Sequence, residues 1–346
     1  MTRKEAFSKL HRPNVSDKVL LLTHTDMDAA GAEVLCKLVF KDLTVKHLNN
    51  SKMSDGILKY VKENIESQEY NIIIVDDISC STEVAAEIDS IKGDMRLVLL
   101  DHHDTAVHLN NYNWAIVSSE LLKDSFMVDR YEEADKAHSS GTSLMYDYLE
   151  YCELLNNCEF VKELSHLIAA YDTWDWNYLL GKDEKYLKLD MLCDIYGLED
   201  FVEEMYNRAV CNHSIENFFT EKDERKLKSY EDKVQEYLEN VKESFVESEL
   251  DYKGEIQSVV WCFTSSFLQE TFGLMKEMFP NKDMYIINYG AGVALRTDKE
   301  SLHVGNLARQ RYGGGGHPGA AGFGISQEVK KKCLEIMLDG TLTNKE

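Results

Sequence analysis

The sequence predicts an α/β fold with two domains, and three observations support this prediction. Short apolar runs alternate with helix-forming segments through the N-terminal part of the chain, which is typical of a parallel sheet covered by helices on both faces. The chain has 346 residues, more than one ordinary core holds. Near residue 250 the pattern changes and new strand-like runs begin, which predicts a second, smaller α/β domain.

The N-terminal domain is expected to begin with a strand over residues 18–23 that leads into a helix over residues 29–40. The same pattern then repeats. Further strands are expected at 43–48, 71–75 and 95–100, and further helices at 54–67 and at 81–91, the last with a serine or threonine N-cap. Residues 140–185 also have a helical pattern.

Residues 216–249 form a long charged stretch with apolar residues at intervals of three or four, which predicts a connecting helix or helix pair. Beyond it the pattern predicts strands at 256–261, 284–289 and 292–296, and a helix at 266–278. The predicted boundaries are residues 1–215 for the first domain, 216–250 for the helical linker and 251–346 for the second domain.

Composition excludes several classes of protein. The formal net charge of −23 and the lack of a basic track argue against a protein that binds a long duplex, although solubility alone is the simpler reason for the charge. No apolar run approaches the roughly 20 residues of a membrane helix. No apolar segment follows the charged start, so we expect no secretory signal and a cytoplasmic protein. The eight cysteines form no CxxC pair, which indicates reduced thiols and no structural zinc.

Ligand-type side chains gather where the predicted strands end. His24, Asp26 and Asp28 follow the first strand, and alternation along an extended segment would place all three on one side. Open parallel sheets bind ligands outside the carboxyl ends of their strands, so we expect these residues to contribute to a site for two divalent metal ions. For Asp28 alone, a helix N-cap is the alternative interpretation.

Asp76 and Asp77 follow the strand at 71–75. A carboxylate at this position can bridge two cations with its two oxygens, and only one of the pair needs to do so. The other points elsewhere by the alternation rule, and capping of the helix that begins near Ser81 is its expected role.

Asp101, His102 and His103 end the next strand. Adjacent histidines diverge, so one can bind metal while the other reaches a phosphate, and the aspartate can orient an imidazole. The alternative interpretation is that the two histidines are ordinary surface residues.

Asp172 ends a helical run; alone it would be a turn residue, but here it is expected as a further acidic ligand. Nitrogen and oxygen donors suit manganese, magnesium or cobalt.

The glycine-rich string at residues 312–323 is the most distinctive in the chain. Its consecutive glycines expose backbone N–H groups that can surround an anion, and His317 adds a donor at the same place. A hinge or tight turn is the alternative for the glycines alone. Arg296 is a second candidate phosphate ligand, with an ordinary surface arginine as the competing interpretation.

Together these motifs resemble those of the DHH phosphoesterases with a DHHA1 domain, a family named for the Asp-His-His string at residues 101–103. The resemblance covers nearly the whole chain and includes the Gly-Gly-Gly-His string at 314–317. Within the family, the His-x-Asp-x-Asp string at 24–28 and the Asp-Ile-Ser string at 77–79 are similar to those of nanoRNase-type oligoribonucleases. The resemblance implies an N-terminal DHH domain with two manganese ions and a C-terminal DHHA1 domain that binds the substrate's end, with catalysis between them.

The resemblance also implies a role for each site residue. His24, Asp26 and Asp77 would hold one metal ion, and Asp28, Asp77, His102 and Asp172 would hold the other, with Asp77 ranked above Asp76 as the bridge. Asp101, His102 and His103 would be catalytic, with His103 facing the phosphate. The substrate would be bound by Arg296, Gly314, Gly315, Gly316 and His317.

The expected function is the manganese-dependent hydrolysis of short RNA or dinucleotides to mononucleotides. Magnesium and cobalt are the alternative metals. A phosphatase of 3′-phosphoadenosine 5′-phosphate and a cyclic-dinucleotide phosphodiesterase are compatible with the same residues. A RecJ-like single-strand DNA exonuclease fits less well because the chain has little room for extra nucleic-acid-binding modules. An inorganic pyrophosphatase is also disfavoured, because the second domain of those enzymes lacks the glycine-rich histidine string. A nucleotide-binding protein without catalysis is the non-enzymatic alternative. No long duplex or membrane partner is expected, and a homodimer is compatible with the sequence.

Overall fold

The computed structural model of the chain separates into two compact units, Met1–Leu227 and Lys228–Glu346. The residues that the structure describes are 1–49, 53–155, 158–299, 301–316 and 318–338. The candidate ligand His317 lies outside the described residues.

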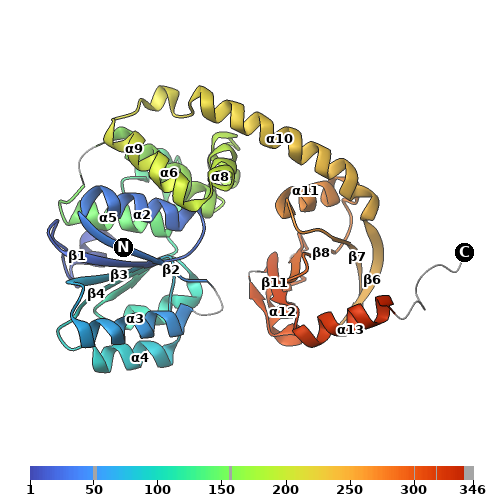
Figure 1. The fold of residues 1–346 in the computed structure, drawn as a ribbon, viewed down its shortest axis with the longest axis horizontal. Helices are drawn as coiled ribbons and strands as arrows, with labels where there is room; N and C mark the ends of the chain where they lie inside the picture. Colours follow the sequence, from blue (N-terminus) through green and yellow to red (C-terminus); the bar gives the residue numbers. More distant parts are fainter. Residues whose placement is uncertain (50–52, 156–157, 300, 317, 339–346) are drawn as a thin grey trace, which may run out of the picture. The chain divides into compact units, whose positions relative to one another are not determined.

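The first unit is built on a five-stranded parallel sheet in the order β2-β1-β3-β4-β5 (Figure 1). Neighbouring strands are in register so that Leu22 lies beside Val75, and Val75 lies beside Leu99. The carboxyl ends of β1, β3 and β4 therefore meet at one edge, at the point where the strand order reverses. The strands are β1 (Lys18–Thr23), β2 (Asp42–His47), β3 (Ile72–Asp76), β4 (Arg96–Asp101) and β5 (Ala115–Val117).

Helices cover both faces of this sheet, with α2 and α5 on one side and α3 and α4 on the other (Figure 1). Alternate residues of β1 enter different cores: Leu21 packs in the core beneath α2, and Leu22 packs in the core beneath α3. The central strands β1, β3 and β4 are almost entirely apolar because both of their faces are buried, and the edge strand β2 is partly exposed. This arrangement confirms the predicted α/β fold. The helices of this unit are α1 (Arg3–Phe7), α2 (Met27–Val39), α3 (Met53–Ser67), α4 (Thr82–Ile91), α5 (Gly141–Tyr151), α6 (Glu159–Asp172), α7 (Asp175–Tyr178), α8 (Lys185–Tyr196) and α9 (Leu198–Val210).

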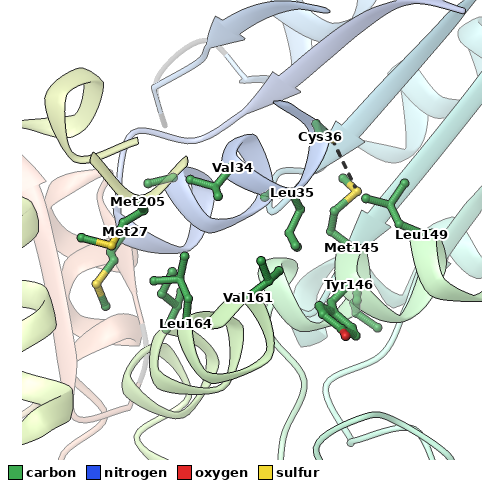
Figure 2. Packing of buried hydrophobic residues seen from close by; sticks show 14 of the residues in the cluster. Met27, Val34, Leu35, Cys36, Met145, Tyr146, Leu149, Val161, Leu164 and Met205 are labelled. Atoms are coloured by element: carbon green, nitrogen blue, oxygen red, sulfur yellow. Dashed lines mark hydrogen bonds between the residues drawn. The ribbon is translucent and has the colours of Figure 1, made fainter. Parts of the chain in front are cut away.

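The larger core lies between α2, α5 and α6, as Figure 2 shows with Leu35, Met145 and Val161. The thiol of Cys36 lies 3.8 Å from the sulfur of Met145 at the contact between α2 and α5. Close approach of these two helices requires Gly31, because a Cβ there would lie 2.2 Å from Thr142 Oγ1. Tight packing of α2 against α5 brings the start of α5 to the metal-ligand candidates on α2.

The prediction of a helix or helix pair over 216–249 is partly wrong. Helix α10 (Glu221–Val241) occupies most of the range, but β6 (Val246–Tyr252) begins before its end. Strand β6 is an edge strand whose residues are mostly exposed, and its apolar residues Val246, Leu250 and Tyr252 alternate with the acidic residues between them. This alternation was a strand signal that the helical prediction overlooked, and β6 pairs antiparallel with β7 (Glu255–Phe263).

The second unit contains a six-stranded sheet in the order β10-β11-β9-β8-β7-β6, in which only β7 and β8 pair in parallel. None of the helices in the described part of the chain has the length and apolar content that crossing a membrane requires. The remaining elements are α11 (Leu268–Met278), β8 (Met284–Asn288), β9 (Gly292–Arg296), α12 (Val304–Tyr312), β10 (Gly315–Gly316), β11 (Ala320–Gly324) and α13 (Gln327–Leu338).

Candidate metal centre

The carboxyl edge of the parallel sheet brings together ligand-type residues from β1, β3, β4 and α6. Three overlapping groups offer side-chain nitrogen or oxygen atoms that all lie within 4.8 Å of one another inside each group. The groups are His24, Asp26 and Asp77; Asp28, His102 and Asp172; and Asp77, Asp101, His102 and His103.

The first group lies where β1 turns into α2. Asp26, not Asp28, is the N-cap of α2, and its Oδ1 accepts a hydrogen bond of 3.1 Å from the backbone N–H of Ala29. Its other oxygen, Oδ2, lies 2.5 Å from His24 Nδ1. The alternative that Asp28 caps its own helix is therefore wrong, because Asp28 lies inside the first turn of α2.

Asp28 is instead held by the start of a distant helix, α5. Its two carboxylate oxygens accept hydrogen bonds from the backbone N–H groups of Gly141 at 2.6 Å and Thr142 at 2.9 Å, and from Ser140 Oγ at 2.8 Å. The partial positive charge of a helix N-terminus stabilises a carboxylate in this position. We did not predict these three residues as part of the site, although Ser140 as an N-cap was a recognisable signal.

Asp77 lies at the middle of the cluster. It has a left-handed backbone conformation with φ of 60°, which aspartate tolerates better than most residues, and its N–H donates to Leu100 O. The Nε2 atom of His102 lies 3.2 Å from Asp77 Oδ1 and 3.5 Å from Asp172 Oδ2. Asp77 therefore belongs to two of the three groups.

Asp76 has different surroundings from its neighbour. Its side chain is fully buried, and neither carboxylate oxygen has a hydrogen-bond partner. The expectation that it caps the next helix is wrong, because Ser81 caps α4 through a hydrogen bond to Val84 N. Asp76 is in none of the three groups formed by the described residues.

Asp101 organises the two histidines that follow it. Its Oδ1 atom accepts hydrogen bonds from the backbone N–H of His102 at 2.7 Å and lies 2.7 Å from His103 Nδ1. Burial raises the pKa of Asp101, but the hydrogen bond and charge of His103 outweigh burial and leave the pKa below its ordinary value. The same hydrogen bond raises the pKa of His103 to about 9, so this imidazole is positively charged at neutral pH.

Three other acids have pKa values shifted in the opposite direction. Burial, and then repulsion by Asp28, raise the pKa values of Asp76, Asp77 and Asp172 well above the ordinary range. Burial lowers the pKa of His102, which keeps its imidazole neutral and able to bind a metal. So many buried carboxylates can ionise together only if a cation compensates their charge.

The donor atoms fit divalent cations. Among the ligand candidates, Oδ2 of Asp101 and Oδ2 of Asp172 are buried without a hydrogen-bond partner. Buried polar atoms normally have partners, so these oxygens indicate that a group is bound here in the working protein. Carboxylate oxygens with imidazole nitrogens suit manganese or magnesium, and the groups contain no cysteine.

The glycine at the start of α5 gives the first testable prediction. A Cβ atom on Gly141 would lie 2.7 Å from Asp77 Cβ and 2.9 Å from Asp28 Oδ2. Gly141→Ala is therefore expected to displace two ligand candidates, lowering metal affinity and kcat/KM by about 10- to 100-fold and the free energy of unfolding by about 1–3 kcal/mol. Urea unfolding, manganese titration and initial rates measure these effects.

The matched control for this prediction is Gly273→Ala. Gly273 lies inside α11 with no atom within 4 Å of the Cβ position, so alanine there is expected to be neutral or to stabilise the protein by about 0.5–1 kcal/mol. A Gly141→Ala protein that bound manganese like the unmodified protein would contradict the proposed crowding.

The remaining predicted ligands lie in the second unit. Arg296 ends β9, beside Ala320 of β11, and β11 pairs with the glycine strand β10. The guanidinium of Arg296 lies 4.9 Å from the ring centroid of Phe272. The N–H of Gly314 donates to Ala308 O, and Gly315 and Gly316 pair with β11. Arg296 and the glycine string are therefore on two strands of one sheet that are separated by β11.

No family model matches the chain. The sequence is 27% identical over 313 residues to the oligoribonuclease NrnB of Bacillus subtilis (strain 168), and the match covers 89% of this chain and 73% of that protein. This similarity confirms the resemblance to the oligoribonuclease branch that the motifs indicate.

Two solved structures cover most of the chain at low identity. A pGpG-specific phosphodiesterase, PggH, from Vibrio cholerae is 14% identical with a TM-score of 0.47, over 93% of this chain and 98% of that one. An exopolyphosphatase-related protein from Bacteroides fragilis is 13% identical with a TM-score of 0.47, over 94% of this chain and 93% of that one.

Proposed function

We propose that this chain, which is similar to an oligoribonuclease over most of its length, is a manganese-dependent phosphodiesterase that hydrolyses short oligoribonucleotides to mononucleotides. The observation that carries the proposal is the overlap of the three ligand groups at Asp77 and His102 on one edge of the sheet. Overlapping groups of oxygen and nitrogen donors are what a pair of divalent ions requires.

In the proposed site, His24, Asp26 and Asp77 hold one ion, and Asp28, Asp77, His102 and Asp172 hold the other. The hydrogen bonds from the start of α5 support the orientation of Asp28. When bound, the two ions would supply Lewis-acid stabilisation of the phosphate's developing charge and a water nucleophile at neutral pH.

The protein's own side chains are proposed to bind and orient the substrate phosphate. His103 carries a positive charge at neutral pH because Asp101 raises its pKa, and its side chain is 40% exposed, so it can contact a phosphate oxygen of the substrate. Asp101 keeps His103 charged and holds its ring through Nδ1, which leaves Nε2 for the substrate. No serine or cysteine nucleophile is needed in this scheme.

The second unit is proposed to bind the rest of the substrate through Arg296, Gly314, Gly315, Gly316 and His317. Arg296 and Gly315–Gly316 lie on the same sheet, which supports a shared role. The N–H of Gly314 is already used by Ala308 O, so this glycine serves mainly by allowing close packing: a Cβ there would lie 2.1 Å from Gly322 O.

The acidic composition supports a short substrate rather than a long strand, since the net charge is −23. A substrate panel under one set of manganese conditions tests the proposal. It contains dinucleotides, pentanucleotides and long strands of RNA and DNA, a cyclic dinucleotide and 3′-phosphoadenosine 5′-phosphate. Fastest turnover of the dinucleotide and pentanucleotide RNA is expected. Robust cleavage of long strands with none of the short RNA would overturn the proposal.

A further inference from the structure

Trp174 is unusual among the four tryptophans of the chain because of its exposure. Its side chain is 56% exposed, whereas Trp114 is 1% and Trp176 is 9% exposed. It follows the ligand candidate Asp172 by two residues, so the two Cα atoms are at most about 7 Å apart. A large apolar side chain therefore faces solvent on a backbone position close to a ligand candidate of the metal centre.

The backbone holds this tryptophan in a special conformation. Trp174 has φ of 64° and ψ of 8°, the left-handed region that a bulky residue rarely adopts. Its N–H donates to Tyr171 O at 3.1 Å, and its carbonyl accepts from Asn177 N at 3.0 Å. Backbone outliers of this kind cluster at functional sites, where the surrounding structure maintains them.

The residue after Trp174 anchors the turn to the other side of the metal centre. The side chain of Asp175 is 1% exposed and accepts hydrogen bonds from the backbone N–H of His138 at 2.8 Å and from His138 Nδ1 at 2.7 Å. His138 is two residues before Ser140, which holds Asp28. The turn that carries Trp174 is therefore connected through the chain to Asp172 and through hydrogen bonds to the segment that precedes Ser140.

The indole is also supported by other rings. Its centroid lies 6.1 Å from that of Trp176 with the planes tilted by 32°, and Trp176 in turn stacks on Tyr171. Part of the indole is packed, and the exposed part is presented on a fixed backbone. An aromatic surface that is already ordered loses little entropy when a flat ligand stacks on it.

We infer that Trp174 stacks on a nucleobase of the substrate and makes the site selective for nucleotides over other phosphodiesters. This inference rests on the proposed function. The metal ligands and His103 bind the phosphate, while the neutral indole offers what a base recognises, a flat apolar face. Stacking does not distinguish one base from another, so the effect applies to all dinucleotides.

The test is the pair of variants Trp174→Asn and Trp174→Phe. Asparagine removes the ring but suits the left-handed backbone, so the fold is retained; phenylalanine retains a ring. For a diadenylate substrate, Trp174→Asn is expected to raise KM about ten-fold with kcat little changed, and Trp174→Phe to restore most of the loss. With a dinucleotide that lacks one base, the difference between unmodified protein and Trp174→Asn is expected to shrink.

Tyr178→Asn is the matched control, because Tyr178 is an aromatic residue, 77% exposed, at the end of the short helix α7 that follows Trp174. Its KM is expected to stay unchanged. An equal rise in both asparagine variants would overturn the inference, as would an unchanged KM in Trp174→Asn.

A binding measurement separates this inference from the proposed function. Adenosine 5′-monophosphate with manganese is expected to quench the tryptophan fluorescence of the unmodified protein but not of Trp174→Asn, and ribose 5-phosphate is expected to quench neither. If no oligonucleotide is hydrolysed, the proposed function fails, and the quenching still decides whether Trp174 binds a base. Equal quenching of both proteins would overturn the inference.

Discussion

Replacing Asp77 by asparagine is expected to lower kcat/KM about a thousand-fold, which corresponds to several kcal/mol of lost metal stabilisation. Asp77 is the residue shared by the groups that contain His24 and His102, so its loss affects both proposed ions. Asparagine has nearly the same shape, and it removes one of several buried, mutually repelling carboxylates. The variant should therefore fold and melt at or above the temperature of the unmodified metal-free protein. Manganese titration and initial rates with a diribonucleotide measure the loss.

Asp76→Asn is the matched control for this prediction, since the two residues are adjacent and both buried. Asp76 is outside the three ligand groups, so its amide variant is expected to retain most manganese affinity and to lose less than about ten-fold in rate. A larger loss of activity and manganese affinity in Asp76→Asn than in Asp77→Asn would show that Asp76 is the bridging ligand and that ranking Asp77 above it is wrong.

Removal of divalent cations by EDTA is expected to abolish hydrolysis and to make stability fall steeply with rising pH. In the metal-free protein the folded-state pKa values of Asp76, Asp77 and Asp172 lie above the unfolded value of about 3.9. From that pH up to the raised pKa values, the folded state binds more protons than the unfolded state. Stability therefore decreases as pH rises through this window.

Two histidines modify this dependence. The raised pKa of His103, about 9, contributes stability that is present below about pH 6.5 and is lost as pH rises through 9. The lowered pKa of His102 has the opposite sign, because the unfolded state then takes up the extra proton. Three acids and His103 outweigh His102, so the net slope stays negative.

Thermal unfolding with and without manganese at about pH 5 and about pH 8 measures the effect. Bound cations neutralise the carboxylates, so the difference in Tm between the two forms should be larger at the higher pH. The metal-free Asp77→Asn variant, with one fewer repelling acid, should show a shallower fall. A Tm that EDTA leaves unchanged at both pH values would contradict a metal centre at this edge.

The N-terminal sheet was predictable because its signals are local. The expected strands at 18–23, 71–75 and 95–100 closely match β1, β3 and β4, since strands buried on both faces must be apolar throughout. The short strand β5 and the exposed edge strand β6 were not predicted. β5 has only three residues, too few for a clear pattern, whereas the apolar and acidic alternation of β6 lies largely within the range that was assigned to a helix.

The ligand candidates of the first unit were also predictable as a set. In a parallel sheet all carboxyl ends lie on one edge, so residues that follow separate strands converge there whatever their distance in sequence. What each carboxylate contacts was less predictable. The sequence offered Asp28 as an N-cap, but the structure assigns capping of α2 to Asp26, and the approach of α5 to α2 places Asp28 at the start of α5.

By itself, the sequence determined the parallel α/β core and the gathering of acids and imidazoles at its carboxyl edge, because the hydrophobic period and the position after a strand are properties of neighbouring residues. The tertiary structure alone decided that Gly141 must lack a side chain, that Asp28 is held by the start of α5, and that Trp174 is exposed two residues after Asp172. These properties depend on distances between segments far apart in the chain, and packing sets those distances.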